Sequence, residues 1–266
     1  AAAIVTLLVG LTGFIVVPLR RMRVMTIPEF YERRFGKTIR IMGGIILAFA
    51  GIINMGMFLK AGSLFVAGVT GLTDPVYIKI IMTVMLGMVL IYTTLGGMVA
   101  VVVLDYIQFV VLSFCLLFMC ILSIQHLGWD NLIDTVAKLR GEAGFNPFHE
   151  GGFGFSYVAW MFFGGLASCA IWQTAVIRAC AAESTSVVKK LYTWSSIGFL
   201  IRWLLPVFLG VSAFVFIAND PHLKAIFIPD GAEASPDTTM LAMPIYLSRV
   251  IPFGLIGVIT AGMLAA

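Results

Sequence analysis

The sequence predicts an all-α integral membrane protein with about seven transmembrane helices. Of its 266 residues, 61% are apolar and 11% are charged, and the mean hydropathy is +1.05. A soluble domain of average composition has roughly 45–50% apolar and about 25% charged residues, so a water-soluble globule is excluded. The formal charge of +4 does not indicate nucleic-acid binding, because the basic residues gather in two connecting segments.

Seven apolar runs have the length of about 20 residues that a helix needs to cross roughly 30 Å of hydrocarbon. The runs fall near 1–19, 42–69, 76–95, 98–123, 154–176, 192–218 and 250–266. The stretch 76–123 is too long for one helix, and we expect it to turn back at Gly96-Gly97. We expect residues 1–266 to form a single transmembrane domain that is an excerpt of a longer protein, because the chain lacks an initiator methionine and stops inside an apolar run.

The distribution of Lys and Arg predicts which connections face the cytoplasm. Segment 20–40 contains seven basic residues and segment 177–191 contains three, and alternating spans place both on one side. The opposite segments, 124–153 and 219–249, hold four basic residues against eight acidic ones. By the positive-inside rule, 20–40 and 177–191 are cytoplasmic in a multi-pass protein of the plasma (inner) membrane.

The two outer segments are expected to contain short helices. Apolar residues recur at helical spacing from Trp129 to Leu139, which predicts an amphipathic helix on the outer face. A similar pattern follows Pro236, with Asp237 as the expected N-cap of a second outer helix that ends at Val250.

No motif of an enzyme is present in the sequence. The three histidines lie in outer segments without partners at ligand spacing, and the four cysteines lack the spacing of a zinc site or a disulfide framework. There is no nucleotide-binding loop and no nucleophile–base pair. We therefore expect no catalytic residues and no cofactor.

Arg202 is the most unusual polar residue of the apolar runs. It lies about ten residues, or roughly 15 Å, into the run that begins near Tyr192, which is close to the membrane midplane. Pro206 follows one turn later and frees the carbonyl of Arg202. A guanidinium at this depth indicates a ligand for a carboxylate or for several hydroxyls. The alternative is a structural ion pair with an acid elsewhere in the full protein.

Three further polar residues lie inside the runs. Asn54 lies about 18 Å from the inner end of its span, a depth shared with Arg202, and either lines a common cavity or bonds across a helix interface. Lys60 lies about 27 Å along the same helix, where snorkelling to the outer surface is expected. Asp105 lies roughly 10 Å from the inner side, and either attracts a cation or pairs with Arg178 or another inner basic residue.

Span 154–176 combines small and polar residues. Gly164-Gly165 either permits close helix packing or marks a helix that unwinds so that its carbonyls face a solute. Ser168, Cys169, Trp172 and Gln173 follow within the same span.

Three blocks of the chain together resemble the sodium/solute symporter family, which includes sodium/proline, sodium/sugar, sodium/pantothenate and sodium/sialic acid cotransporters. The blocks are the stretch from Thr26 to Gly36, the stretch from Tyr92 through Gly96-Gly97 to Asp105 and Gln108, and Gln173 followed by Arg178 and the run from Ala181 to Ser184. The resemblance implies a leucine-transporter-type (LeuT-like) fold of two inverted repeats, of which this chain would hold core helices 2 to 8. Solute and sodium would lie near the midplane between broken core helices.

The resemblance also implies roles for particular residues. Asn54 and Arg202 match places at which sugar-transporting members present an asparagine and a lysine to the solute, and Ser168 and Cys169 stand where those members have an aromatic pair. With Trp172, this makes Asn54, Ser168, Trp172 and Arg202 the expected substrate-binding residues. Because arginine adds a planar fork suited to carboxylates, the substrate need not be a sugar.

The sodium residues implied by the resemblance are Asp105 and Ala266. Ala266 matches an alanine whose carbonyl contributes to the principal sodium site, and the hydroxyl residues of that site would follow it. Asp105 matches an aspartate that contributes to a further sodium site or to the inward exit path. Sodium is thus the expected coupling ion, and the site is expected to be incomplete within these residues.

The resulting hypothesis is a sodium-coupled secondary active symporter that imports a small polar organic solute by alternating access. The expected partners are the solute, Na⁺ and the lipid bilayer, with no nucleic acid and no obligate protein partner. Two alternatives remain: a proton-coupled carrier of the same fold, and a membrane sensor or channel-like module on the same scaffold.

Overall fold

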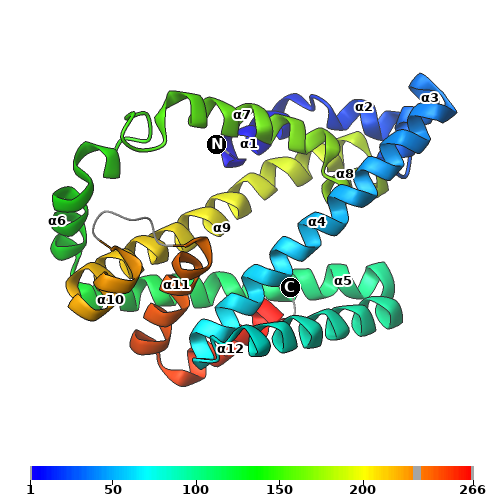
Figure 1. Ribbon diagram of the computed structural model, residues 1–266. Helices are drawn as coiled ribbons and strands as arrows, with labels where there is room; N and C mark the ends of the chain where they lie inside the picture. Colours follow the sequence, from blue (N-terminus) through cyan, green and yellow to red (C-terminus); the bar gives the residue numbers. More distant parts are fainter. Residues whose placement is uncertain (1, 230–234, 265–266) are drawn as a thin grey trace. The chain divides into compact units, whose positions relative to one another are not determined.

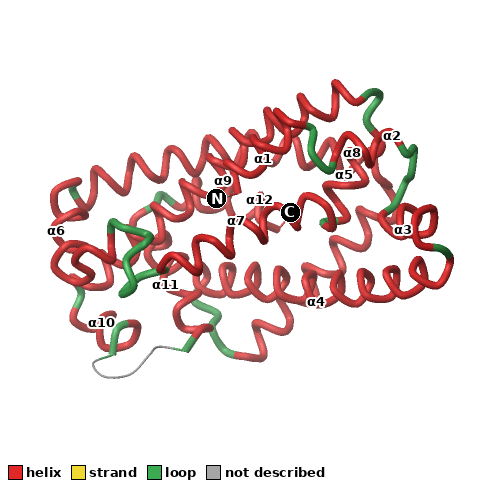
Figure 2. The backbone as a smooth tube through the Cα atoms, turned by 90° about the horizontal axis from the view of Figure 1, so that it is seen from above, coloured by secondary structure: helices red, strands yellow, loops and turns green. Residues whose placement is uncertain are grey.

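The computed structural model describes residues 2–229 and 235–264, and all regular structure within them is helical (Figures 1 and 2). The helices are α1 Ala2–Thr12, α2 Val16–Arg21, α3 Ile27–Phe35, α4 Lys37–Thr70, α5 Pro75–Leu127, α6 Trp129–Arg140, η1 Gly141–Gly144 (a 3₁₀ turn), α7 Gly154–Ile171, α8 Gln173–Ala181, α9 Thr185–Asn219, α10 Pro221–Phe227, α11 Pro236–Val250 and α12 Phe253–Leu264. The predicted all-α class is confirmed.

Five helical segments of the described residues are long and apolar enough to cross a membrane. They are Lys37–Thr70, Pro75–Gly97, Val99–Leu127, Gly154–Ile171 and Thr185–Asn219. Two shorter apolar helices are Ala2–Thr12 and Phe253–Met263. The most apolar part of Lys37–Thr70 buries none of its residues within the protein, as expected of a surface that faces lipid.

Helix α5 leaves helical geometry at Gly97, where φ is 59° and ψ is −165°. Only glycine adopts such a backbone conformation without strain, because it has no Cβ. The two legs, Pro75–Gly97 and Val99–Leu127, run in opposite directions in Figure 1. The turn therefore lies where the sequence predicts it.

The first predicted span, 1–19, consists of two helices. Helix α1 ends at Thr12, and the chain then passes through Gly13 with φ 73° and Ile15 with φ 68° before α2 begins at Val16. Positive φ at a β-branched residue is uncommon and interrupts any helix. Apolar composition alone gave no sign of this break, because Phe14 and Ile15 continue the hydrophobic run.

The chain divides into two compact units, of which the first comprises Ala1–Asn54 and Arg140–Trp203. In this unit α1 packs on α7, and α2 and α3 pack on α8. One buried cluster contains Val5, Val9, Val16, Cys169, Ala179, Val188 and Tyr192, and a second contains Leu19, Val24, Ile27, Val176 and Cys180.

The second unit comprises Met55–Leu139 and Leu204–Ala266. Its core surrounds the fully buried Tyr246 of α11 and includes Met119 of α5, Leu209 of α9 and Ile259 of α12. In this unit α5 packs on both α11 and α12.

The helices predicted in segments 124–153 and 219–249 are present as α6 and α11, and their position on the outer side stays a prediction. The N-cap of α11 is Ser235, whose hydroxyl oxygen accepts a hydrogen bond from the Thr238 backbone N–H at 3.2 Å. The prediction of Asp237 as N-cap was wrong, because Pro236 occupies the first helical position and shifts the cap to the residue before it. Asp237 lies in the first helical turn instead.

Candidate solute and sodium site

The apolar run 154–176 is interrupted at Trp172. Helix α7 ends at Ile171, α8 begins at Gln173, and Trp172 between them has φ −71° and ψ 102°, an extended conformation. Its N–H still donates to the Ser168 carbonyl at 2.9 Å, and its own carbonyl accepts from the Val176 N–H at 3.0 Å.

Where one helix ends and another begins, some backbone N–H and C=O groups lack the partner that a continuous helix would give them. Within hydrocarbon, such groups are tolerated only where they are buried in protein or line a water-filled cavity. Discontinuous helices also present half-helix ends to ions and charged solutes. The backbone around Trp172 is therefore a candidate site for a small solute or an ion.

The break lies seven residues after the tandem glycines. Helix α7 is continuous through Gly164 and Gly165, so of the two alternatives for the tandem glycines, the structure shows no unwound segment at these residues. A Cβ added to Gly165 would lie 3.4 Å from Cγ2 of Val5. The glycine thus lets α1 pack closely against α7, which is the other function that tandem glycines serve in membranes.

Ser168 and Trp172 lie one turn apart at the end of α7. The Ser168 hydroxyl donates to the Gly164 carbonyl at 2.8 Å, and its side chain is exposed. Trp172 is 45% exposed. The structure thus brings these two predicted substrate residues together at the helix break.

Arg202 and Asn54 belong to the same unit but to other helices. Arg202 lies in α9 with an exposed side chain, and Pro206 is within that helix, so the carbonyl of Arg202 lacks its usual N–H donor. Asn54 of α4 is half-buried. Apart from the backbone hydrogen bond between Trp172 and Ser168, no hydrogen bond or ion pair among the described residues joins any two of Asn54, Ser168, Trp172 and Arg202.

The predicted sodium residues lie in the second unit. Asp105 is exposed on the second leg of α5. Ala266 lies outside the described residues. One turn after Asp105, the Gln108 side chain is 8% exposed and its Nε2 donates to the carbonyl of Gly262 in α12 at 3.2 Å.

Gln108 is a structural residue that the sequence reasoning missed. It stands out only as an amide within an apolar run, the same signal that identified Asn54. The helices meet closely beside it, since a Cβ on Gly262 would lie 2.7 Å from Cδ2 of Leu112. The part of α5 that carries Asp105 is thereby held against the part of α12 that leads to Ala266.

No group of three or more His, Cys, Asp or Glu side chains is placed to hold a metal ion, within the part of the chain that the structure describes.

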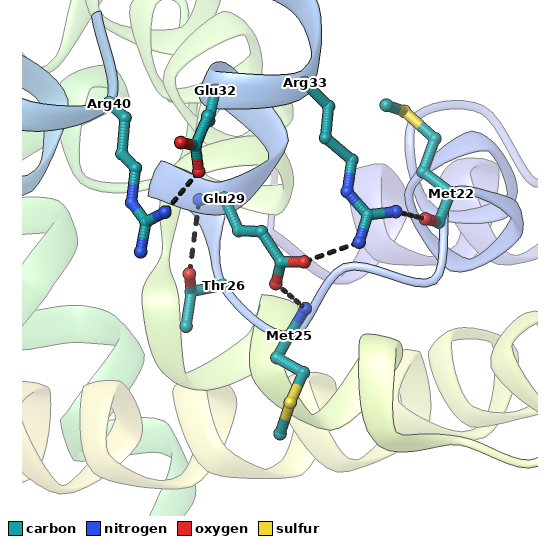
Figure 3. A network of polar contacts seen from close by, with 7 residues as sticks. All are labelled: Met22, Met25, Thr26, Glu29, Glu32, Arg33 and Arg40. Carbon is teal, nitrogen blue, oxygen red and sulfur yellow. Dashed lines mark hydrogen bonds and ion pairs between the residues drawn. The ribbon is translucent and has the colours of Figure 1, made fainter. Parts of the chain in front are cut away.

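Segment 20–40 is held by a network of polar contacts around the start of α3 (Figure 3). The Thr26 hydroxyl oxygen caps the helix by accepting from the Glu29 N–H at 3.3 Å, and Glu29 Oε2 accepts from the Met25 N–H at 2.7 Å. Arg33 forms an ion pair with Glu29 at 2.6 Å and also donates to the Met22 carbonyl. The hydrogen bond from Met25, assisted by Arg33, lowers the pKa of the Glu29 carboxyl.

The two segments predicted to be cytoplasmic touch each other. Arg20 Nη2 donates to the Glu183 carbonyl at 3.3 Å, and α2 and α3 both pack on α8. Segments 20–40 and 177–191 therefore lie at the same end of their unit, as an alternating topology requires.

Five helical segments of the described residues have membrane-spanning length, and the apolar run that contains one of them is broken at Trp172. These features define a multi-pass membrane protein of the kind that includes secondary transporters. The sodium:solute symporter family model matches residues 1–266, and the chain belongs to this family.

Several curated relatives carry transporter names. The chain is 29% identical over 268 residues to a sodium/glucose cotransporter of Vibrio parahaemolyticus, a match that covers 91% of this chain and 46% of that protein. It is 33% identical over 122 residues to the sodium-dependent multivitamin transporter of Oryctolagus cuniculus, covering 46% of this chain and 18% of the relative. It is 31% identical over 121 residues to the high-affinity proline transporter PutP of Bacillus subtilis (strain 168), a match that covers 44% of this chain and 24% of that protein. The chain thus spans less than half of each relative.

Proposed function

We propose that this chain is part of a sodium-coupled secondary transporter that imports a small polar organic solute by alternating access. The observation that carries the proposal is the helix break at Trp172 inside an apolar run of a family of symporters. A LeuT-like fold with core helices 2 to 8 in this chain accounts for a broken helix at this place.

The solute in this proposal binds at the break and is contacted by Ser168 and Trp172, with Asn54 and Arg202 completing the site. The planar guanidinium of Arg202 makes two parallel hydrogen bonds to a carboxylate or to neighbouring hydroxyls. The names of the relatives include a sugar, a vitamin class and an amino acid, so we assign only the class of small polar organic solutes.

Sodium in this proposal binds at Asp105 and at the carbonyl of Ala266. Gln108 acts as a positioning residue, because its bond to Gly262 fixes the approach of α5 and α12. Segments 20–40 and 177–191 face the cytoplasm, and the contact between Arg20 and Glu183 supports their placement on one side of the plasma membrane.

A thermal-shift screen tests the solute site. Sugars, amino acids and carboxylates are added to the complete protein in sodium chloride or in choline chloride, because a ligand stabilises the state that it binds. We expect one solute class to raise Tm in sodium chloride, and the shift to shrink in choline chloride. Arg202→Gln should lose the solute shift, whereas the control Lys190→Gln, an exposed residue of segment 177–191, should keep it.

Two outcomes would contradict the assignment. If Arg202→Gln kept the full solute shift and merely lowered the Tm of the free protein, Arg202 would be a structural residue. If the solute shift were equal in sodium and choline and instead depended on pH, the carrier would be coupled to protons.

A further inference from the structure

The basic side chains of segment 20–40 fall into two sets. The segment contains seven basic residues and only two acidic ones, a net charge of +5. Both carboxylates are already engaged within the protein. The engaged set consists of Arg33 with Glu29, Arg40 with Glu32, and Arg20 with the Glu183 carbonyl.

The second set consists of Arg21, Arg23, Arg34 and Lys37, and all four side chains are exposed. Among the described residues, Arg21, Arg23 and Lys37 form no hydrogen bond or ion pair through their side chains. Arg34 is placed only over the ring of Phe35, with Cζ 5.7 Å from the centroid. Four cations are thus left for a partner outside the chain.

Exposed apolar side chains stand between these cations. Met25 is 76% exposed and Phe35 is 58% exposed. Helix α3 is anchored to its own unit through Ile27, which is 1% exposed and packs with Val176 and Cys180 of α8. The segment is therefore a fixed element with cationic and apolar groups on its free surface, the combination found at membrane interfaces.

Arg23 adds a backbone observation. Its φ is 51°, in the left-handed region that favours glycine. The turn after α2 thus carries an exposed arginine at a position where glycine would fit the backbone better. Strain of this kind points to a functional side chain.

We propose that Arg21, Arg23, Arg34 and Lys37 bind the phosphate groups of anionic phospholipids at the inner membrane surface, with Met25 and Phe35 inserted between the headgroups. Charge complementarity selects the partner, because juxtamembrane clusters of Lys and Arg are attracted to the negative surface of the cytoplasmic leaflet. Lys37 begins α4, a helix of membrane-spanning length, and Arg21 ends α2. This surface is separate from the proposed solute site.

The test compares lipids on the complete protein in mixed micelles. Phosphatidylglycerol or phosphatidylcholine is titrated in, and Tm is followed to obtain the half-saturating lipid concentration. Phosphatidylglycerol should raise Tm, and Arg23→Gln/Lys37→Gln should weaken this effect about 30-fold, because each basic residue near an anionic surface contributes about 1 kcal/mol. The matched control Lys138→Gln/Lys224→Gln removes the same charge from outer segments and should leave it unchanged.

Two further measurements keep the test independent of folding. Arg23→Gly removes the cation and suits the backbone, so it should retain or raise Tm in phosphatidylcholine while weakening the phosphatidylglycerol effect. Raising the salt concentration should reduce the effect in the wild type. Equal shifts with phosphatidylcholine, an unchanged lipid response in Arg23→Gln/Lys37→Gln, or the same shift with inorganic phosphate alone would each overturn the proposal.

Discussion

Lys60 Nζ lies 2.7 Å from Asp237 Oδ1, an ion pair that joins α4 to the first turn of α11. The two side chains are 49% and 55% exposed, so the pair is at the surface of its unit. The ammonium pairs with an acidic residue of α11, and the snorkelling of Lys60 to the outer surface stays a prediction. Asp237 also lies where the helix dipole favours a negative charge.

A double-mutant cycle on Lys60→Met and Asp237→Asn should give a coupling energy of about 0.2–1 kcal/mol, because half-exposed ion pairs are screened by solvent. The measurement is the free energy of unfolding of the wild type, the two single variants and the double variant. The Arg249–Asp220 pair, whose atoms are 3.6 Å apart, provides a comparison that should couple no more strongly. Strictly additive single effects at Lys60 and Asp237 would show that the contact contributes nothing.

Gly262→Ala should lower Tm, because its Cβ would lie 2.7 Å from Leu112 Cδ2 at the α5–α12 contact. Overpacking of this kind costs about 1–3 kcal/mol. Leu112→Ala in the same chain should restore part of the loss, since it removes the clashing atoms. Gly257→Ala on the same helix has open space and should be neutral or stabilising. Equal Tm values for the two alanine variants would refute the close contact.

Gly164→Ala should be tolerated. No atom lies within 4 Å of the added Cβ, and α7 is helical at this position, so alanine should stabilise it by up to about 1 kcal/mol. Gly10→Ala is the contrasting variant, because its Cβ would lie 2.5 Å from the Thr193 backbone nitrogen, which cannot move aside easily. Thermal unfolding of both variants measures the difference, and Gly10→Ala should have the lower Tm. A severe loss of stability in Gly164→Ala would restore the unwinding hypothesis for the tandem glycines.

Gln108→Leu should reduce stability by about 0.5–1.5 kcal/mol through loss of the hydrogen bond to Gly262. If Gln108 positions the sodium residues, the variant should also need more sodium to reach half of the sodium-induced rise in Tm. Ser113→Ala is the control, since its hydroxyl bonds only within its own helix, to the Phe109 carbonyl. A stability loss without any change in the sodium dependence would limit Gln108 to a structural role.

The pH dependence of segment 20–40 follows from Glu29, whose carboxyl pKa is lowered by the Met25 N–H and by Arg33. A depressed pKa in the folded state means that the carboxylate stabilises the fold above its unfolded pKa, about 4.3. That contribution is lost as the pH falls through the lower, folded pKa. The Tm difference between wild type and Glu29→Gln should therefore shrink as the pH is lowered below about 5.

Glu150→Gln is the control for this titration, because among the described residues the Glu150 side chain has no hydrogen bond or ion pair. Its Tm should follow the wild type across the same range. A Glu29→Gln variant with the same Tm as the wild type at every pH would show that the network in Figure 3 adds nothing to stability.

Local signals in the sequence predicted the helical class, the helices α6 and α11, and the turn at Gly97. Two glycines between long apolar runs are visible without any tertiary structure. The breaks at Ile15 and Trp172 were not predictable in this way, because both residues are apolar and their conformations depend on packing against other helices. The Gln108–Gly262 bond joins residues 154 positions apart, which spacing along the chain cannot reveal.

The predicted substrate residues also divide into a pair that local spacing could bring together and a pair that it could not. Ser168 and Trp172 belong to one helix end, so their proximity was implied by their spacing of one turn. Asn54 and Arg202 were linked by depth alone, and their roles as ligands stay predictions. Sodium binding by Asp105 and Ala266 is also a prediction.

The most direct test of the account is uptake by the complete protein in proteoliposomes. The radiolabelled solute that gives the largest thermal shift is added outside with a sodium gradient, and sodium is then replaced by choline at fixed pH. We predict that uptake rises above the equilibrium level with sodium and falls to background with choline, and that Arg202→Gln abolishes it while Lys190→Gln does not. Full uptake in choline would contradict sodium coupling.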